Sequence, residues 1–442
     1  MGVLGALEQV NASWYIPSVA INHASDLAKT IITRGTRKHR DKLPALNVLR
    51  EILEIAFYAS LETEEGRDLR FGLCCIPKGT LLKSQDSPDA APRLLRLEAP
   101  TTLSIDALRK FAPAVSSHLA YILVEWGTGS SRLSIAGIVH LGPSWDLAKK
   151  GYTDTTDGPP NALLIDTSGR GRLEASVGHF HLAQLAGGKI TRRSTKPFLP
   201  LNDTMDLIRP GLRRLSDFTR TEEGADVLQV YMETLCATLN GIEGKRHGGT
   251  VLLCSQRWAE KKAAALLKPK YRLAQGDILR SAITEYLHLR RELLRPHLRG
   301  KGTLSFSERA TILANNPDAT SLRRALNSAA LTIAELASVD GAVLLTTDLT
   351  CYGFGCEILT AKTKAATALP VSDKNKVGKH PINSEERGMR HRSALRLCGT
   401  AACSELAAFV CSQDGGISMI YRDLEKRLLV RKIVAHNYAF SF

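Results

Sequence analysis

A predicted helix and a predicted strand meet in residues 335–343, which read Glu-Leu-Ala-Ser-Val-Asp-Gly-Ala-Val. Apolar residues at helical spacing run to Ser338, and an apolar run begins at Ala342. Asp340 and Gly341 therefore stand where the chain enters a sheet. Ligands of α/β proteins bind at the edges of such sheets, so we expect the carboxylate of Asp340 to lie in a functional site.

A second polar segment, residues 384–394, reads Ser-Glu-Glu-Arg-Gly-Met-Arg-His-Arg-Ser-Ala. We interpret it as a loop that leads into a helix over Ala394–Cys403. The basic residues 390–392 and Ser393 would then gather donors near a helix N-terminus, where backbone N–H groups and the helix dipole favour an anion. Two guanidinium groups can each bind phosphate oxygens through two hydrogen bonds. The segment therefore predicts a phosphate-binding site.

Helical and strand patterns alternate around these two segments. The predicted helices are Thr221–Leu239, Trp258–Leu267, Asp277–Leu294, Phe306–Ala314 and Ser321–Ser338. The predicted strands are Thr250–Ser255, Ala342–Thr347, Gly353–Leu359, Ala407–Ser412 and Gly416–Tyr421. Strands that alternate with helices indicate an α/β fold in which helices flank a sheet.

Residues 1–200 show a different pattern. One helical stretch, Ala45–Glu62, precedes short apolar or alternating runs that are separated by Gly, Ser, Asp and Pro. These predicted strands are Phe71–Ile76, Ala120–Glu125, Leu133–Leu141, Ala162–Asp166 and Leu173–His181. The pattern indicates an α+β domain rich in antiparallel strands.

Two nearby prolines, Pro197 and Pro200, disfavour both a helix interior and a central strand. We therefore predict a boundary there, with residues 1–200 as an α+β regulatory domain, residues 201–224 as a connector and residues 225–442 as an α/β domain. A chain of 442 residues is long enough for two or three domains.

Charge and cysteine content narrow the class of protein. The formal net charge of +15 predicts an acidic partner, and nucleotide phosphates, nucleic acid and acidic protein surfaces all qualify. Nine cysteines without a secretion signal indicate reduced thiols rather than a disulfide framework. Apolar runs fall short of the roughly 18 residues of a membrane span. We expect a cytoplasmic protein with no membrane partner.

The two polar segments together resemble the signature of the diadenylate cyclase (DAC) domain family. The resemblance rests on Asp340-Gly341-Ala342 and, 50 residues later, on Arg390-His391-Arg392. It spans roughly residues 225–425. Further matches point to the DNA-integrity-scanning branch of that family: Glu335-Leu336-Ala337, Ser384, Glu386, Gly388, and Ser412-Gln413.

The resemblance implies that two ATP molecules are joined into cyclic di-AMP with release of two pyrophosphates. Each 3′-hydroxyl would attack the α-phosphorus of the other ATP, so the resemblance also implies self-association with facing active sites. Asp340 would hold an Mg²⁺ or Mn²⁺ ion, and Arg390 and Arg392 would bind phosphate. The other residues implied as catalytic are Gly341, Ala342 and His391, and those implied to bind nucleotide are Thr347, Gly388, Ser393, Ser412 and Gln413.

Two departures accompany the resemblance. Many relatives carry histidine where this chain has Val339, and Glu-Glu where it has Gln413-Asp414, and both differences agree with the DNA-scanning branch. That branch continues into helical DNA-binding domains, whereas this chain ends at Phe442. We therefore do not expect DNA scanning or a nucleic-acid partner. Residues 1–200 instead resemble the sensor of sensor-plus-cyclase proteins of bacteria, with an unidentified ligand.

Three alternatives stay open. A nucleotide-binding sensor would bind ATP or a cyclic dinucleotide without releasing pyrophosphate. A nucleic-acid-binding protein would lose affinity steeply as salt rises. A cyclase with a different product would keep the same motifs. Outside these segments, His179 and His181 point to one face of a predicted strand, but a third metal ligand is not evident near them, so we do not predict a metal site there.

Overall fold

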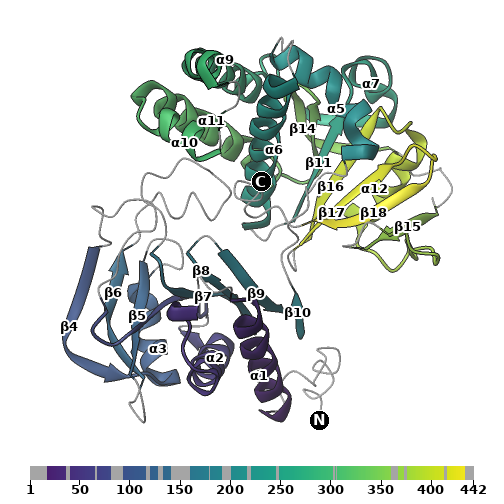
Figure 1. The fold of residues 1–442 in the computed structure, drawn as a ribbon. Coiled ribbons are helices and arrows are strands. Elements are labelled where there is room, and N and C mark those ends of the chain that lie inside the picture. Colours follow the sequence, from purple (N-terminus) through teal and green to yellow (C-terminus); the bar gives the residue numbers. More distant parts are fainter. Residues whose placement is uncertain are drawn as a thin grey trace, which may run out of the picture. The chain divides into compact units, whose positions relative to one another are not determined.

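The computed structural model describes residues 17–35, 40–64, 67–80, 93–115, 120–127, 133–140, 160–178, 180–191, 201–216, 221–244, 248–301, 304, 306–359, 367–372, 376–412 and 416–433. The chain divides into two compact units (Figure 1). Unit 1 comprises Met1–Leu147 and Thr155–Arg193, and unit 2 comprises Ala148–Asp154 and Ser194–Phe442. Each unit combines helices with a mixed sheet, as the sequence predicted.

Unit 1 packs helices against a largely antiparallel sheet with the strand order β10-β9-β8-β7-β3-β5-β6-β4. Strands β3 and β5 run parallel. Helix residues such as Leu27, Leu53 and Leu108 share one buried apolar core with strand residues such as Leu73 and Ile122. The helices are α1 (Pro17–Arg34), α2 (Leu46–Leu61) and α3 (Ile105–Phe111), and the strands are β1 (Thr63–Glu64), β2 (Arg67–Asp68), β3 (Gly72–Pro77), β4 (Arg93–Thr102), β5 (Ala120–Trp126), β6 (Ser134–His140), β7 (Leu163–Gly169), β8 (Arg172–Val177), β9 (Phe180–Ala186) and β10 (Lys189–Thr191).

Unit 2 is built on a sheet with the strand order β12-β14-β13-β11-β16-β17-β18-β15, in which β11 with β13 and β15 with β18 run parallel. Its strands are β11 (Gly249–Cys254), β12 (Leu267–Arg272), β13 (Ala342–Thr346), β14 (Cys351–Ile358), β15 (Ala368–Val371), β16 (Leu406–Cys411), β17 (Ile417–Arg422) and β18 (Leu428–Ile433). Its helices are α5 (Leu201–Leu215), α6 (Thr221–Gly244), α7 (Gln256–Lys261), α8 (Ala263–Leu266), α9 (Ile278–Lys301), α10 (Phe306–Ala314), α11 (Pro317–Leu336) and α12 (Met389–Thr400).

The two faces of this sheet bury different residues because side chains alternate along each strand. Leu252, Ala342 and Ala408 share an apolar core with α7, α8 and α12. On the other face α6 and α11 lie so close together that a Cβ on Gly241 would be 2.7 Å from Cβ of Ala334. Helix α11 begins where the Asn316 side chain accepts a hydrogen bond from the backbone N–H of Ala319.

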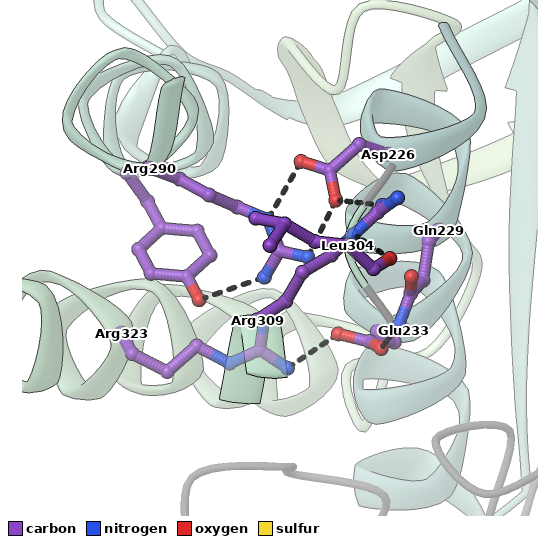
Figure 2. Close-up of polar contacts among 8 residues, drawn as sticks. Asp226, Gln229, Glu233, Arg290, Leu304, Arg309 and Arg323 are labelled. Atoms are coloured by element: carbon purple, nitrogen blue, oxygen red, sulfur yellow. Dashed lines mark hydrogen bonds and ion pairs between the residues drawn. The ribbon is translucent and has the colours of Figure 1, made fainter. Parts of the chain in front are cut away.

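Buried ion pairs join the helices on this side (Figure 2). Arg290 of α9 binds both carboxylate oxygens of Asp226 on α6, at 2.5 and 2.6 Å. Arg323 of α11 donates to Glu233 of α6 at 2.7 Å, and both side chains are almost fully buried. Arg309 of α10 reaches Asp226 at 3.4 Å. Three successive helices, α9, α10 and α11, are thereby each joined to α6.

Residues 201–224, which were predicted as a connector, contain helix α5 and the first turn of α6. Helix α5 is packed into unit 2, because a Cβ on Gly211 would lie only 2.1 Å from the carbonyl oxygen of Thr347. The sequence interpretation also missed the strands β1, β2, β4, β10, β12, β15 and β18. The predicted strand Leu173–His181 is instead the hairpin of β8 and β9.

In the part of the chain that the structure describes, each helix is too short or too polar to cross a bilayer.

Candidate active site

The register of the unit 2 sheet brings the two sequence motifs to one edge. Ala342 at the start of β13 pairs with Thr250 of β11, which pairs with Val410 of β16, which pairs with Ser418 of β17. These residues form one row across four strands. The segment before β13 and the end of β16 therefore lie at the same edge, although about 70 residues of chain separate them.

Asp340 and Gly341 are held at this edge by close backbone packing. Gly341 has φ +115°, and a Cβ there would lie 2.5 Å from the carbonyl carbon of Gly355 in β14. Glycine is required because an L side chain would be strained in this conformation and would clash. The side chain of Asp340 beside it is fully exposed. The strand entry thus presents one carboxylate to solvent from a rigid backbone.

Helix α12 begins at Met389, five residues before the predicted start at Ala394. Gly388 occupies the N-cap, and no described side chain caps the first turn. The predicted loop residues Arg390, His391 and Arg392 therefore lie inside that first turn. Unbonded N–H groups and the positive end of the helix dipole favour an anion at this position, and Gly388 leaves open space beside it.

Arg390 and Arg392 point to different sides of α12. The Nη2 atom of Arg390 lies 3.7 Å from Oδ1 of Asp340, which joins the two motifs. Arg392 follows two residues later, about 200° further around a helix of 3.6 residues per turn. Its Nη1 atom instead donates to Oε2 of Glu385 at 3.3 Å. The structure brings Arg390, but not Arg392, to Asp340.

His391 points toward the sheet rather than toward solvent. Its Nε2 atom lies 3.3 Å from the hydroxyl oxygen of Ser418 in β17. Burial lowers the pKa of His391 below its usual value, and the nearby charges of Arg387 and Lys432 lower it further. A neutral imidazole at this place ties the start of α12 to β17. The geometry therefore fits a positioning role for His391 better than direct phosphate binding.

Only some of the remaining predicted residues lie near Asp340 and the start of α12. Ser393 lies in the first turns of α12, and Ser412 follows β16 at the same sheet edge, where its N–H donates to the carbonyl oxygen of Gly416 at 3.0 Å. Gln413 lies outside the described residues. Thr347 is buried after the far end of β13, and its N–H donates to the carbonyl oxygen of Cys254. The structure therefore does not bring Thr347 into the site.

The donor set at the edge suits a metal ion that is shared with a substrate. Within the described residues no three His, Cys, Asp or Glu side chains gather into a metal cluster, and His179 lies outside them. Asp340 offers a single exposed carboxylate, which lies 3.7 Å from Arg390. Mg²⁺ is commonly bound by one or two carboxylates together with water and substrate phosphates. Asp340 is therefore the residue that would hold a Mg²⁺ or Mn²⁺ ion at this site.

Three residues that bear on the site escaped the sequence interpretation: Ser418, Glu385 and Arg396. Ser418 is recognisable only once the register of β17 places it under α12. Arg396 lies four residues after Arg392, and Nη2 of Arg396 is 3.7 Å from Oε1 of Glu385. The four-residue spacing puts both arginines on one face of a helix. The sequence alone would have shown this if the predicted helix had begun at Met389 instead of Ala394.

Comparison with known proteins gives one match. A family described as "Probable sensor domain DACNV" matches residues 38–140. Residues 38–140 of unit 1 are therefore similar to a family of probable sensor domains. The match covers less than half of the chain and does not reach Asp340 or Arg390. No curated protein and no solved structure matches the chain.

Proposed function

We propose that unit 2 is a diadenylate cyclase whose activity is regulated by the sensor domain of unit 1. The observation that carries the proposal is the contact of Arg390 with Asp340, 3.7 Å apart at one sheet edge although 50 residues separate them in sequence. A cation that can bind phosphate thus faces an exposed carboxylate beside a helix N-terminus. The sensor match in residues 38–140 supports the regulatory part.

Each side chain has a distinct task in the proposed reaction. Arg390 and the backbone N–H groups of the first turn of α12 bind phosphate oxygens and stabilise charge that develops on the departing pyrophosphate. In this reaction Asp340 would hold the metal or accept the proton of the attacking 3′-hydroxyl. A bound Mg²⁺ or Mn²⁺ ion would polarise the phosphate and lower the pKa of the hydroxyl.

The overall reaction balances with ATP as the sole substrate. Each 3′-oxygen forms a bond to the α-phosphorus of the other ATP, and each bond from that phosphorus to the β-phosphate bridging oxygen breaks. Two pyrophosphates and one cyclic di-AMP result. Because one site holds one ATP, two copies of unit 2 must face each other during the reaction, so self-association is part of the proposal.

The test is incubation of the full chain with ATP and Mn²⁺ or Mg²⁺, with cyclic di-AMP and pyrophosphate measured by mass spectrometry. Asp340→Asn and Arg390→Ala should each lower the rate about 100-fold or more, the usual effect of removing a group that stabilises the transition state. Glu425→Gln is the matched control, because Glu425 is exposed in the turn between β17 and β18 at the other end of the sheet.

Two results would count against parts of the proposal. Cyclic di-AMP synthesis at the normal rate in Asp340→Asn or Arg390→Ala would show that the assigned residues are not the active site. ATP binding without product under every metal condition would favour a nucleotide-binding sensor that lacks catalysis.

A further inference from the structure

The outer face of α12 carries a pair of arginines that share one carboxylate. Arg392 and Arg396 lie one helical turn apart, and Glu385 from the preceding loop reaches both. Its Oε2 atom accepts from Nη1 of Arg392 at 3.3 Å, and its Oε1 atom lies 3.7 Å from Nη2 of Arg396. Two guanidinium groups therefore converge on a single anion, on the side of the helix away from Asp340.

The loop before α12 is shaped so that Glu385 reaches this position. The side chain of Asn383 accepts from the N–H of Glu385 at 3.1 Å and donates to the carboxylate of Glu386 at 2.8 Å. The N–H of Arg387 then donates to the carbonyl oxygen of Ser384 at 3.2 Å, which closes a tight turn. The neighbouring carboxylates are thereby separated, with Glu386 bound to Asn383 and Glu385 bound to the arginines.

The contact of Glu385 with the arginines is weak enough to be replaced. The side chain of Glu385 is 59% exposed, and those of Arg392 and Arg396 are 35% and 31% exposed. Ion pairs as exposed as these contribute about 0–1 kcal/mol. Guanidinium groups bind carboxylate and phosphate in the same forked geometry, and a polyphosphate brings more charge. The carboxylate of Glu385 thus marks a place where a phosphate group fits.

We propose that Arg392 and Arg396 form a polyphosphate subsite on the outer face of α12, which Glu385 occupies until the phosphates of a nucleotide displace it. Arg396 is then a further substrate-binding residue, and Glu385 is an internal competitor. The inference rests on the proposed function for the identity of the ligand, a nucleoside triphosphate. The subsite also gives a role to Arg392, which the structure does not bring to Asp340.

The experiment measures binding of inorganic tripolyphosphate and of ATP to the full chain by calorimetry at low salt. Glu385→Gln should tighten tripolyphosphate binding about 1.5- to 5-fold, because an exposed competing ion pair is lost. Arg396→Ala should weaken it about tenfold, because a hydrogen bond to a charged group is lost. The affinity of Arg396→Lys for tripolyphosphate should lie between that of the parent chain and that of Arg396→Ala. Lysine keeps the positive charge but cannot make the two parallel hydrogen bonds of a guanidinium group.

Two matched controls accompany these variants. Glu386→Gln removes the adjacent carboxylate, which contacts Asn383 rather than an arginine, and should leave tripolyphosphate affinity unchanged. Arg324→Ala removes an exposed arginine of α11 and should also have no effect. Unchanged or weaker tripolyphosphate binding in Glu385→Gln would overturn the proposal, as would unchanged binding in Arg396→Ala.

The outcome is separable from that of the cyclase test. Tighter binding in Glu385→Gln by a chain that makes no cyclic di-AMP would retain the anion subsite and reject the cyclase. Synthesis of cyclic di-AMP by a chain in which Glu385→Gln and Arg396→Ala bind tripolyphosphate normally would reject the subsite alone.

Discussion

Two of the regions of unit 2 that contain arginine–carboxylate pairs, the helical layer and the sheet edge, differ in the burial and in the length of the contact. In the helical layer, Arg323 and Glu233 are almost fully buried and their closest nitrogen and oxygen atoms are 2.7 Å apart. At the sheet edge, Arg390 is about one-third exposed and lies 3.7 Å from a fully exposed Asp340. An arginine and a carboxylate thus form a short, buried ion pair in the helical layer and a longer, solvent-exposed ion pair at the sheet edge.

The difference separates arginines that hold the fold from arginines that can change partner. A buried charge has lost its water and depends on its partner, so removal of that partner leaves an uncompensated charge. An exposed charge keeps most of its hydration, so a ligand can replace its partner at little cost. The comparison therefore predicts that variants in the first region affect stability and that variants in the second affect binding and catalysis.

The largest effect is expected in the buried cluster. Glu233→Ala should lower the free energy of unfolding by about 3–5 kcal/mol, because Arg323 would remain buried without its carboxylate. Urea denaturation of the full chain measures the change. The exposed Glu285→Ala on α9 is the control and should stay within about 0.5 kcal/mol of the parent chain. If the free energy of unfolding falls no more in Glu233→Ala than in this control, the buried ion pair does not hold the fold.

Arg390→Ala should show the opposite profile. We expect cyclic di-AMP synthesis to fall about 100-fold, or about 2.7 kcal/mol of transition-state stabilisation, with the free energy of unfolding changed by less than about 0.5 kcal/mol. Activity and urea denaturation are measured on the same preparation. A stability loss comparable to that of Glu233→Ala would show that Arg390 holds the fold rather than a ligand.

Gly341→Ala tests how much the close packing of the Gly341 backbone against β14 contributes to stability. With φ +115° and a Cβ 2.5 Å from Gly355, the variant should lose about 1–3 kcal/mol of stability. Gly79→Ala in unit 1 is the control, since Gly79 has φ +78° but open space around it, and so isolates the cost of the dihedral angle. If thermal unfolding shows the same loss of stability in both variants, the close contact of Gly341 with β14 does not contribute to stability.

His391 should give the smallest effect, because it is only partly buried and contacts the neutral hydroxyl of Ser418 rather than a charged group. Its pKa in the folded chain is lowered below 6.5, so the unfolded chain binds the proton first as pH falls. Its contribution to stability is therefore complete above about pH 6.5 and decreases as pH falls through that value. His391→Gln should flatten the dependence of stability on pH between about 7.5 and 5.5. An unchanged slope would contradict a neutral buried imidazole.

Much of the sheet was predictable from sequence because its strands are short apolar runs between turn residues. The strands around Val251, Val343 and Phe409 fall close to their predicted positions. Strand β12 escaped because it is an edge strand whose lysines and Pro269 mask any apolar pattern. Helix α5 escaped because Pro210 lies inside it, and proline ordinarily marks a helix end.

The site was predictable in its parts but not in its arrangement. Asp340 and the basic residues 390–392 were identified by residue type and context. The start of α12 was placed too late because its buried face begins only at Ala394, so the polar first turn resembled a loop. Thr347 was assigned to the site because the family resemblance implied it as a nucleotide-binding residue. A strand carries the chain away along its length, however, and Thr347 reaches the opposite edge.

Gly211 gives unit 2 a mechanical property. Its missing side chain lets the backbone of α5 touch the carbonyl of Thr347 directly, and a Cβ at this point would be 2.1 Å from that oxygen. No side chain stands between the two backbones to absorb a displacement by changing its rotamer. A displacement of helix α5 toward the sheet would therefore have to shift the backbone at the end of β13, the strand whose other end lies beside Asp340.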